Sequence, residues 1–153
     1  MNRLYGLIGF PLGHSFSARY FTEKFQRENL SGYEYRNFPL ESIRELPAML
    51  ENHPGLLGFN VTIPYKQEVI PFLTALSAEA REIGAVNCVK ITPQGLYGHN
   101  TDAYGFRKSL LGLIGPMRPD ALILGTGGAS KAVGYVLREL GIAYTTVSRS
   151  GGP

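Results

Sequence analysis

The stretch ALILGTGGASKAVGYVLRELGIAYTTV, residues 121–147, decides the fold class. Its apolar run Ala121–Leu124 predicts a buried strand that ends at a group of glycines. Apolar side chains then recur at helical spacing over Ala129–Leu140, and Tyr144–Val147 predicts a second strand. A strand, a helix and a strand in this order make a βαβ unit, so its two strands are expected to be parallel.

The segments upstream continue this alternation. The expected strands are Leu4–Gly9, Tyr33–Phe38, Leu56–Ile63, Val86–Thr92 and Leu96–His99. The expected helices begin at Ser17, within Glu41–Asn52 (where Pro47 starts or kinks the helix), after the N-cap Ser77, and beyond Asp102, the last with Ala103, Phe106, Leu110 and Leu113 on one face. Thr92-Pro93-Gln94-Gly95 suits a type I turn and predicts an antiparallel hairpin. The whole pattern predicts an α/β fold with a mostly parallel sheet.

Composition excludes several classes of protein. The 153 residues are 44% hydrophobic and 18% charged, which is enough apolar material for a packed core. The net charge of +3 is scattered, so we expect no nucleic-acid partner. The single cysteine, Cys88, excludes an internal disulfide and a cysteine-based zinc site. No run approaches 18 apolar residues and Met1–Ser15 lacks a signal-peptide pattern, so we expect a soluble, cytoplasmic protein without a membrane partner.

The glycine loop Gly125-Thr126-Gly127-Gly128-Ala129 predicts a dinucleotide site. Glycines between a strand and a helix let the backbone approach a diphosphate, which the helix N-terminus favours. After the next strand comes Ser148-Arg149-Ser150, where a carboxylate would select NAD and an arginine suits the 2′-phosphate of NADP. The sequence favours NADP; the alternative is a solvated loop arginine. Because a doubly wound nucleotide domain needs more than two strands, we interpret the chain as truncated.

Polar side chains interrupt the apolar segments at four further places. Asn60 and Thr62 share one face of the strand Leu56–Ile63, with Phe59, Val61 and Ile63 on the other, and Pro64 and Lys66 follow. We interpret that polar face as a pocket rim. Asp102 stands at a helix start, where spacing alone favours a helix cap, and Asn87 heads a strand. Ser15 and Ser17 could hold a carboxylate at a helix N-terminus, or Ser17 could simply be an N-cap. His14 and His99 lack metal-ligand companions, so we predict structural roles for both and no metal site.

Taken together, these segments resemble the shikimate dehydrogenase family. The resemblance rests on Gly9-Phe10-Pro11 with His14-Ser15-Phe16-Ser17, on Gly58-Phe59-Asn60-Val61-Thr62-Ile63-Pro64-Tyr65-Lys66, on Gly84-Ala85-Val86-Asn87, on Asn100-Thr101-Asp102 with Gly105-Phe106, and on Gly125–Ala129. It implies reversible reduction of 3-dehydroshikimate to shikimate with NADPH, by a monomer or homodimer. It further implies a substrate-binding, catalytic domain at 1–102, followed at 103–153 by a linking helix and the first βαβ unit of an incomplete Rossmann-like NADP domain.

The resemblance also implies residue roles. Lys66 and Asp102 would be the catalytic pair; Ser15 and Ser17 would bind the substrate carboxylate; Asn60, Thr62, Asn87 and Asp102 would bind ring hydroxyls and position Lys66; and Gly125, Thr126, Gly127, Gly128, Ala129, Ser148, Arg149 and Ser150 would bind cofactor. The chain departs from the family pattern at Ala18 for proline, Cys88 for threonine and Ser148 for asparagine. Two alternatives stay open: a quinate/shikimate dehydrogenase that uses NAD, and a non-catalytic binding module.

Overall fold

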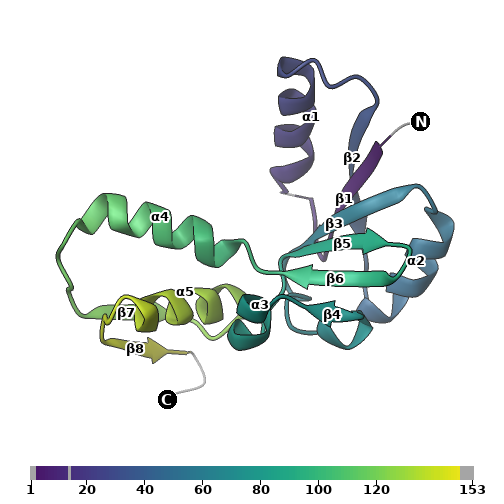
Figure 1. The fold of residues 1–153 in the computed structure, drawn as a ribbon. Helices are drawn as coiled ribbons and strands as arrows, with labels where there is room; N and C mark the ends of the chain where they lie inside the picture. The colour runs from purple at the N-terminus through teal and green to yellow at the C-terminus, as the bar shows by residue number, and fades with distance from the viewer. Residues whose placement is uncertain (1–2, 14, 149–153) are drawn as a thin grey trace.

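The computed structural model describes residues 3–13 and 15–148, which form two sheets with helices around them (Figure 1). The strands are β1 (Arg3–Gly9), β2 (Tyr33–Pro39), β3 (Leu56–Val61), β4 (Ala75–Leu76), β5 (Cys88–Thr92), β6 (Gly95–His99), β7 (Ala121–Leu124) and β8 (Tyr144–Val147). The α-helices are α1 (Ser17–Arg27), α2 (Leu46–Asn52), α3 (Ala78–Ile83), α4 (Asp102–Ile114) and α5 (Gly128–Glu139), and short 3-10 helices are η1 (Ile43–Glu45) and η2 (Ile70–Phe72).

The larger sheet has the strand order β2-β1-β3-β5-β6-β4. Its pairs β1–β2, β1–β3 and β4–β6 are parallel, whereas β5 runs antiparallel to both of its neighbours. The predicted α/β fold with a mostly parallel sheet is therefore confirmed, as is the hairpin of β5 and β6. Strand β4 was not predicted, because a strand of two residues is too short to show an alternation of apolar and polar side chains.

The main core lies on one face of this sheet. Ile8 of β1 and Val61 of β3 are buried there with Leu46 and Met49 of α2 and with Val69 and Val86 from the connecting segments. The opposite face is covered in part by α1, whose Phe21 and Phe25 pack on Leu7 and Tyr35. The expected start of the second helix near Pro47 is confirmed, since Pro47 occupies the first turn of α2. Ser77 caps α3 as predicted, accepting a hydrogen bond from the Ala80 N–H at 3.1 Å.

The smaller sheet is the predicted βαβ unit. β7 and β8 pair in parallel, and α5 connects them. Helices α4 and α5 cover one face, where Ile114, Ile123, Leu137 and Ile142 are buried together. On the other face Leu122 and Leu124 of β7 are 63% and 79% exposed. This sheet thus has one packed face and one open face in the part of the chain that the structure describes.

Three details of the predicted elements are wrong. The strand expected over Val86–Thr92 begins at Cys88, so Asn87 precedes β5 instead of heading it. The third strand ends at Val61 rather than Ile63, and the Ile63 side chain is 72% exposed. Pro64 has no N–H with which to continue a ladder, so pairing stops before it. Leu113 was expected on the apolar face of α4, but its side chain is 81% exposed. The neighbouring residue Ile114 is buried instead, because it is the residue that faces α5. No helix among the described residues is both long enough and apolar enough to span a bilayer.

Alkaline pH should destabilise the fold through its buried phenols. Tyr65 is 3% exposed, and its hydroxyl donates to the Leu40 carbonyl at 2.6 Å. Burial, together with Glu68, Glu45 and Glu41, raises the pKa of Tyr65 above the ordinary value of 10.0. The unfolded phenol therefore loses its proton first, so the contribution of Tyr65 to the free energy of unfolding should be fully present below about pH 10 and be lost above it.

Urea unfolding at pH 8 and pH 11 checks this expectation. Tyr65→Phe should be less stable by about 1–2 kcal/mol at pH 8, because Leu40 loses its donor, yet should lose less stability at pH 11 than the parent chain. The matched control Tyr104→Phe removes a phenol that is 65% exposed and should leave the pH dependence unchanged. An equal pH dependence in the Tyr65→Phe variant and the parent would contradict the assignment.

Candidate active site

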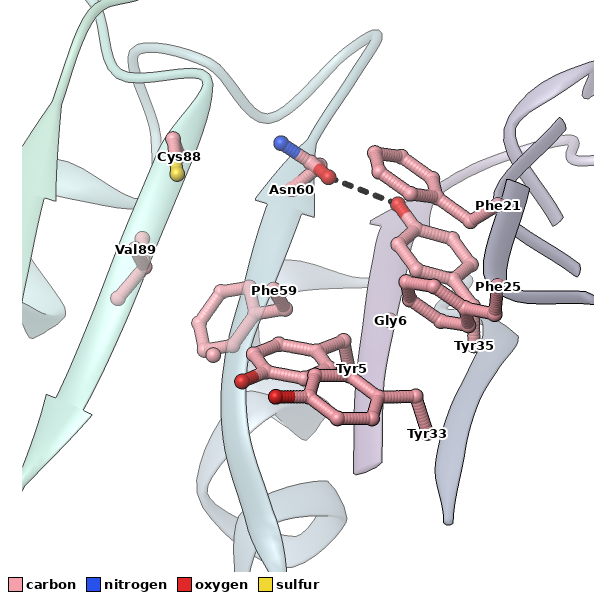
Figure 2. Close-up of a pocket in the computed structure, with 11 residues that line it drawn as sticks. Tyr5, Gly6, Phe21, Phe25, Tyr33, Tyr35, Phe59, Asn60, Cys88 and Val89 are labelled. Atoms are coloured by element: carbon pink, nitrogen blue, oxygen red, sulfur yellow. Dashed lines mark hydrogen bonds between the residues drawn. The ribbon is translucent and has the colours of Figure 1, made fainter. Parts of the chain in front are cut away.

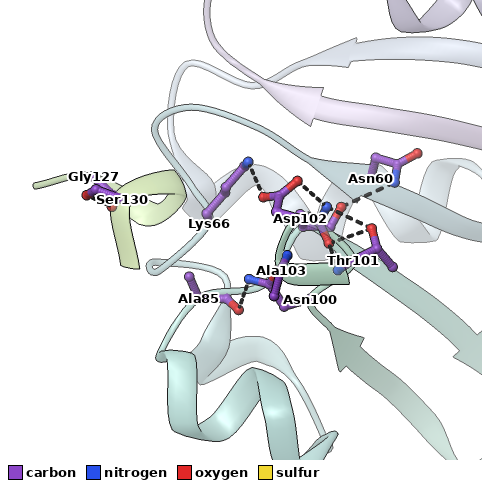
Figure 3. A network of polar contacts seen from close by, with 10 residues as sticks. Asn60, Lys66, Ala85, Asn100, Thr101, Asp102, Ala103, Gly127 and Ser130 are labelled. Carbon is purple, nitrogen blue, oxygen red and sulfur yellow. Dashed lines mark hydrogen bonds and ion pairs between the residues drawn. The ribbon is translucent and has the colours of Figure 1, made fainter. Parts of the chain in front are cut away.

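An ion pair joins two segments that lie far apart in the sequence. The Lys66 Nζ is 2.7 Å from Asp102 Oδ2, and the two side chains are 15% and 32% exposed (Figure 3). Lys66 lies in the segment after β3, where its carbonyl accepts a hydrogen bond from the Val86 N–H at 2.7 Å. Asp102 is the first residue of α4, where the helix N-terminus favours a carboxylate. The pair is thus held from two separate elements and remains open to a small ligand.

Asn87 fixes the carboxylate from its other side. Its Nδ2 donates to Asp102 Oδ1 at 2.7 Å and to Thr101 Oγ1 at 2.9 Å. Its Oδ1 accepts from the Thr101 N–H at 2.8 Å, and the residue is buried. Asn87 therefore uses its side chain to join the loop before β5 to the start of α4.

Asp102 does not cap α4. Asn100 has that role: its Oδ1 accepts from the Ala103 N–H at 3.2 Å, and its Nδ2 donates to the Ala85 carbonyl at 2.9 Å. Asn100 is only 3% exposed, so both hydrogen bonds are protected from water. The helix-cap interpretation of Asp102 is wrong, because the cap is supplied two residues earlier and the carboxylate is left to contact Lys66 and Asn87.

Tyr35 contacts Asn60, and no motif or spacing in the sequence predicted this contact. The Tyr35 hydroxyl donates to Asn60 Oδ1 at 2.8 Å, above an apolar hollow of about 260 Å³ (Figure 2). Asn60 Nδ2 in turn donates to the Asn87 carbonyl at 3.2 Å. Burial raises the pKa of Tyr35, and a hydrogen bond with the Ser17 side chain offsets part of that rise. Hydrogen bonds therefore run from Tyr35 through Asn60 and Asn87 to Asp102.

Ser15, Ser17 and Thr62 line a second hollow, of about 440 Å³, at the start of α1. Ser17 is the first residue of α1 and does not cap it; instead the Ser15 Oγ accepts from the Ser17 N–H at 3.3 Å. The N-cap interpretation of Ser17 is therefore wrong. Three hydroxyl side chains and the start of α1 line this hollow, an arrangement that suits a carboxylate.

The glycine loop leaves open space at the start of α5. Gly125 has a φ of 112°, a conformation that side chains disfavour, and nothing lies within 4 Å of the Cβ positions of Gly125 and Gly127. The 12-residue helix α5 starts directly afterwards, so its first N–H groups face the loop. Ser130 Oγ donates to the Gly127 carbonyl at 2.6 Å, which stabilises the first turn. A phosphate could approach this loop without meeting a side chain at either glycine.

The remaining predicted cofactor residues lie at the end of β8. Ser148 follows that strand directly. Arg149 and Ser150, on which the choice of NADP over NAD depends, lie outside the described residues, as does His14. Within the described residues, no three His, Cys, Asp or Glu side chains are grouped as metal ligands would be.

Comparison with known proteins finds a family that matches this chain. Residues 7–89, more than half of the chain, match the family profile described as the shikimate dehydrogenase substrate binding domain. The chain belongs to the shikimate dehydrogenase family. The matched range contains Ser15, Asn60, Lys66 and Asn87 of the site just described, whereas Asp102 lies beyond it.

Relatives in the shikimate dehydrogenase family extend the match over almost the whole chain. A shikimate dehydrogenase (NADP(+)) of Aquifex aeolicus is 42% identical over 142 residues, which cover 91% of this chain and 52% of the relative. The crystal structure of an Aquifex aeolicus shikimate dehydrogenase is similar over 97% of this chain and 56% of its own, with a TM-score of 0.85 and 40% identity. A Thermus thermophilus shikimate 5-dehydrogenase solved with NADP(H) and shikimate matches 98% of this chain and 57% of its own, with a TM-score of 0.84 and 33% identity. The chain thus spans about half the length of these relatives.

Removing the Tyr35 hydroxyl should measure its contribution to this site. Tyr35→Phe leaves Asn60 Oδ1 without its phenol donor, so the free energy of unfolding should fall by about 1–2 kcal/mol. The matched control Tyr20→Phe removes a phenol on a side chain that is 40% exposed and should cost less than about 0.5 kcal/mol. Urea unfolding of the three proteins tests this, and equal stability of the Tyr35→Phe variant and the parent would contradict it.

Proposed function

We propose that this chain supplies the substrate site, the acid–base pair and part of the cofactor site of an NADP-dependent shikimate dehydrogenase. The reaction is the reversible reduction of 3-dehydroshikimate to shikimate. The observation that carries the proposal is the 2.7 Å ion pair of Lys66 and Asp102, which Asn87 holds and which hydrogen bonds connect through Asn87 and Asn60 to Tyr35. Residues 1–102 form the substrate-binding, catalytic domain, and 103–153 form the linking helix and first βαβ unit of the NADP domain.

The substrate occupies the space between the hollow and the ion pair. Ser15 and Ser17 hold its carboxylate with their hydroxyls and the N-terminus of α1. The ring hydroxyls contact Asn60, Thr62, Asn87 and Asp102, and Tyr35 keeps the Asn60 amide oriented. Contacts to the carboxylate at one end and to the hydroxyls around the ring fix the orientation of the substrate. In this orientation the ring carbonyl lies near the Lys66 ammonium.

The cofactor loop is formed by Gly125, Thr126, Gly127, Gly128 and Ala129, and the open space at two of these glycines supports its fit to a diphosphate. NADPH, when bound, supplies the hydride. Lys66 stabilises the negative charge that develops on the carbonyl oxygen, and the Lys66–Asp102 pair delivers the proton. Asp102 orients the ammonium, and Asn87 orients Asp102. Ser148, Arg149 and Ser150 select the cofactor with a 2′-phosphate.

Initial rates test the proposal. A full-length protein that carries this chain should reduce NADP with shikimate much faster than NAD with quinate, and should oxidise NADPH with 3-dehydroshikimate. A preference for NAD with quinate would assign the quinate/shikimate activity instead. Shikimate binding without turnover by any of these pairs would assign a non-catalytic binding module. The 153-residue chain by itself should bind shikimate weakly and show negligible turnover, because it spans about half the length of its relatives.

A further inference from the structure

The glycine loop contacts the stem of Lys66 directly. A Cβ placed on Gly128 would lie 2.7 Å from the Lys66 Cβ, 3.3 Å from its Cδ and 3.5 Å from its Cγ. Carbon atoms in contact prefer about 3.5–4.0 Å, so the first of these distances is a clash. Figure 3 shows the start of α5, with Gly127 and Ser130, beside Lys66 on the side away from Asp102.

Lys66 has little freedom to move away. Its carbonyl accepts the Val86 N–H at 2.7 Å, and its Nζ is held 2.7 Å from Asp102. Because both ends of the residue are fixed, the stem between them can be displaced only if one of these contacts is lost.

Helix α5 is anchored by buried side chains. Ala132, Tyr135 and Val136 are buried against Ile83 of α3 and Ala103 of α4, each 7% exposed or less. A side chain at position 128 must therefore displace the lysine stem or lift the start of α5 from this cluster.

We propose that Gly128 is a positioning residue for Lys66. Because Gly128 has no side chain, the start of α5 can pack directly against the Lys66 side chain where it extends toward Asp102. The same loop that receives the cofactor diphosphate thereby sets the position of the ammonium. The catalytic part of this inference rests on the proposed function; the contact itself does not.

A role for Gly128 in phosphate binding alone makes a different prediction. If Gly128 only lets the backbone approach phosphate, the methyl group of Gly128→Ala would block that approach and raise the KM for NADPH. The effect of the substitution would then be the same with or without a lysine at position 66. Misplacement of Lys66 instead lowers kcat, since an error near 1 Å in a catalytic group can cost about 10²-fold.

Steady-state kinetics of a full-length protein that carries this chain separates the two roles. Gly128→Ala should lower kcat about 10- to 100-fold and change the KM for NADPH less than about threefold. The control Gly112→Ala places the same methyl group on α4, where nothing lies within 4 Å, and should leave both values unchanged. An unchanged kcat with a raised KM for NADPH would overturn the proposal.

A thermal-unfolding cycle on the 153-residue chain tests the contact without any assay of turnover. Lys66→Gly removes all three contacting carbons, so Gly128→Ala should lower the Tm strongly in the parent and hardly at all in the Lys66→Gly background. If Gly128→Ala alone does not fold, recovery of folding in the double variant supports the contact. Equal Tm losses in both backgrounds, or no recovery, would overturn it. The parent enzyme could prove inactive while Gly128→Ala still lowers the Tm only when Lys66 is present. That result would reject the proposed function but support the contact between Gly128 and Lys66.

Discussion

Replacing Lys66 with alanine in a full-length protein that carries this chain is expected to lower kcat with shikimate and NADP by about 10³-fold. The Lys66 Nζ lies 2.7 Å from Asp102 and is the one cation described at the pair. Without it, the charge that develops on the reacting oxygen is neither stabilised nor protonated. The dissociation constant of shikimate should change less than about fivefold, because the serine, threonine and asparagine contacts remain.

The matched control is Lys24→Ala on α1, where the lysine is exposed and pairs only loosely with Glu28 at 3.8 Å. This variant should keep the parent values of kcat and of the shikimate dissociation constant. Fluorescence or calorimetric titration gives the binding constant separately from the rate. Unchanged turnover in the Lys66→Ala variant would remove Lys66 from the mechanism.

The second large effect is expected from Asp102→Asn, which should lower kcat about 10²-fold. The substituted amide keeps the size of the carboxylate and can still present an oxygen to Asn87 Nδ2, which now donates to Asp102 Oδ1 at 2.7 Å. Its NH2 group then faces the Lys66 ammonium, so two donors oppose each other where an ion pair stood. The ammonium loses its anchor, and its position relative to the substrate carbonyl is no longer fixed.

Asp120→Asn is the matched control, because Asp120 is exposed and precedes β7, away from the ion pair. It should leave kcat unchanged. Circular dichroism and the Tm show whether either variant has lost structure. A value of kcat above about half that of the parent in Asp102→Asn would contradict the proposed anchoring.

Local patterns were sufficient to predict most elements. The glycine loop, the helix after it and the hairpin of β5 and β6 depend on residues close in sequence, whose backbone preferences are strong. Element ends were less predictable. The cap of α4 illustrates why: Asp102 and Asn100 are both good capping residues, and the choice depends on Asn87 and Lys66, which arrive from elsewhere in the fold.

The contacts across the sheet could not be predicted from residue spacing. Tyr35 reaches Asn60 because β2 and β3 both pair with β1, in a register that places Leu7 opposite Asn37 on one side and Asn60 on the other. Nothing in the local sequence states that register. The motif resemblance named Lys66 and Asp102 together, but Tyr35 and the contact of Gly128 with Lys66 required the three-dimensional structure.

The outward-facing leucines of β7 have a practical consequence for handling this polypeptide. The sheet of β7 and β8 exposes Leu122 and Leu124 on one face, and each of its two strands has an unpaired edge among the described residues. Both features favour association with neighbouring molecules. We therefore expect aggregation of this polypeptide to start at β7 and β8 rather than at the six-stranded sheet. A low protein concentration, or a mild detergent that covers Leu122 and Leu124, should reduce it.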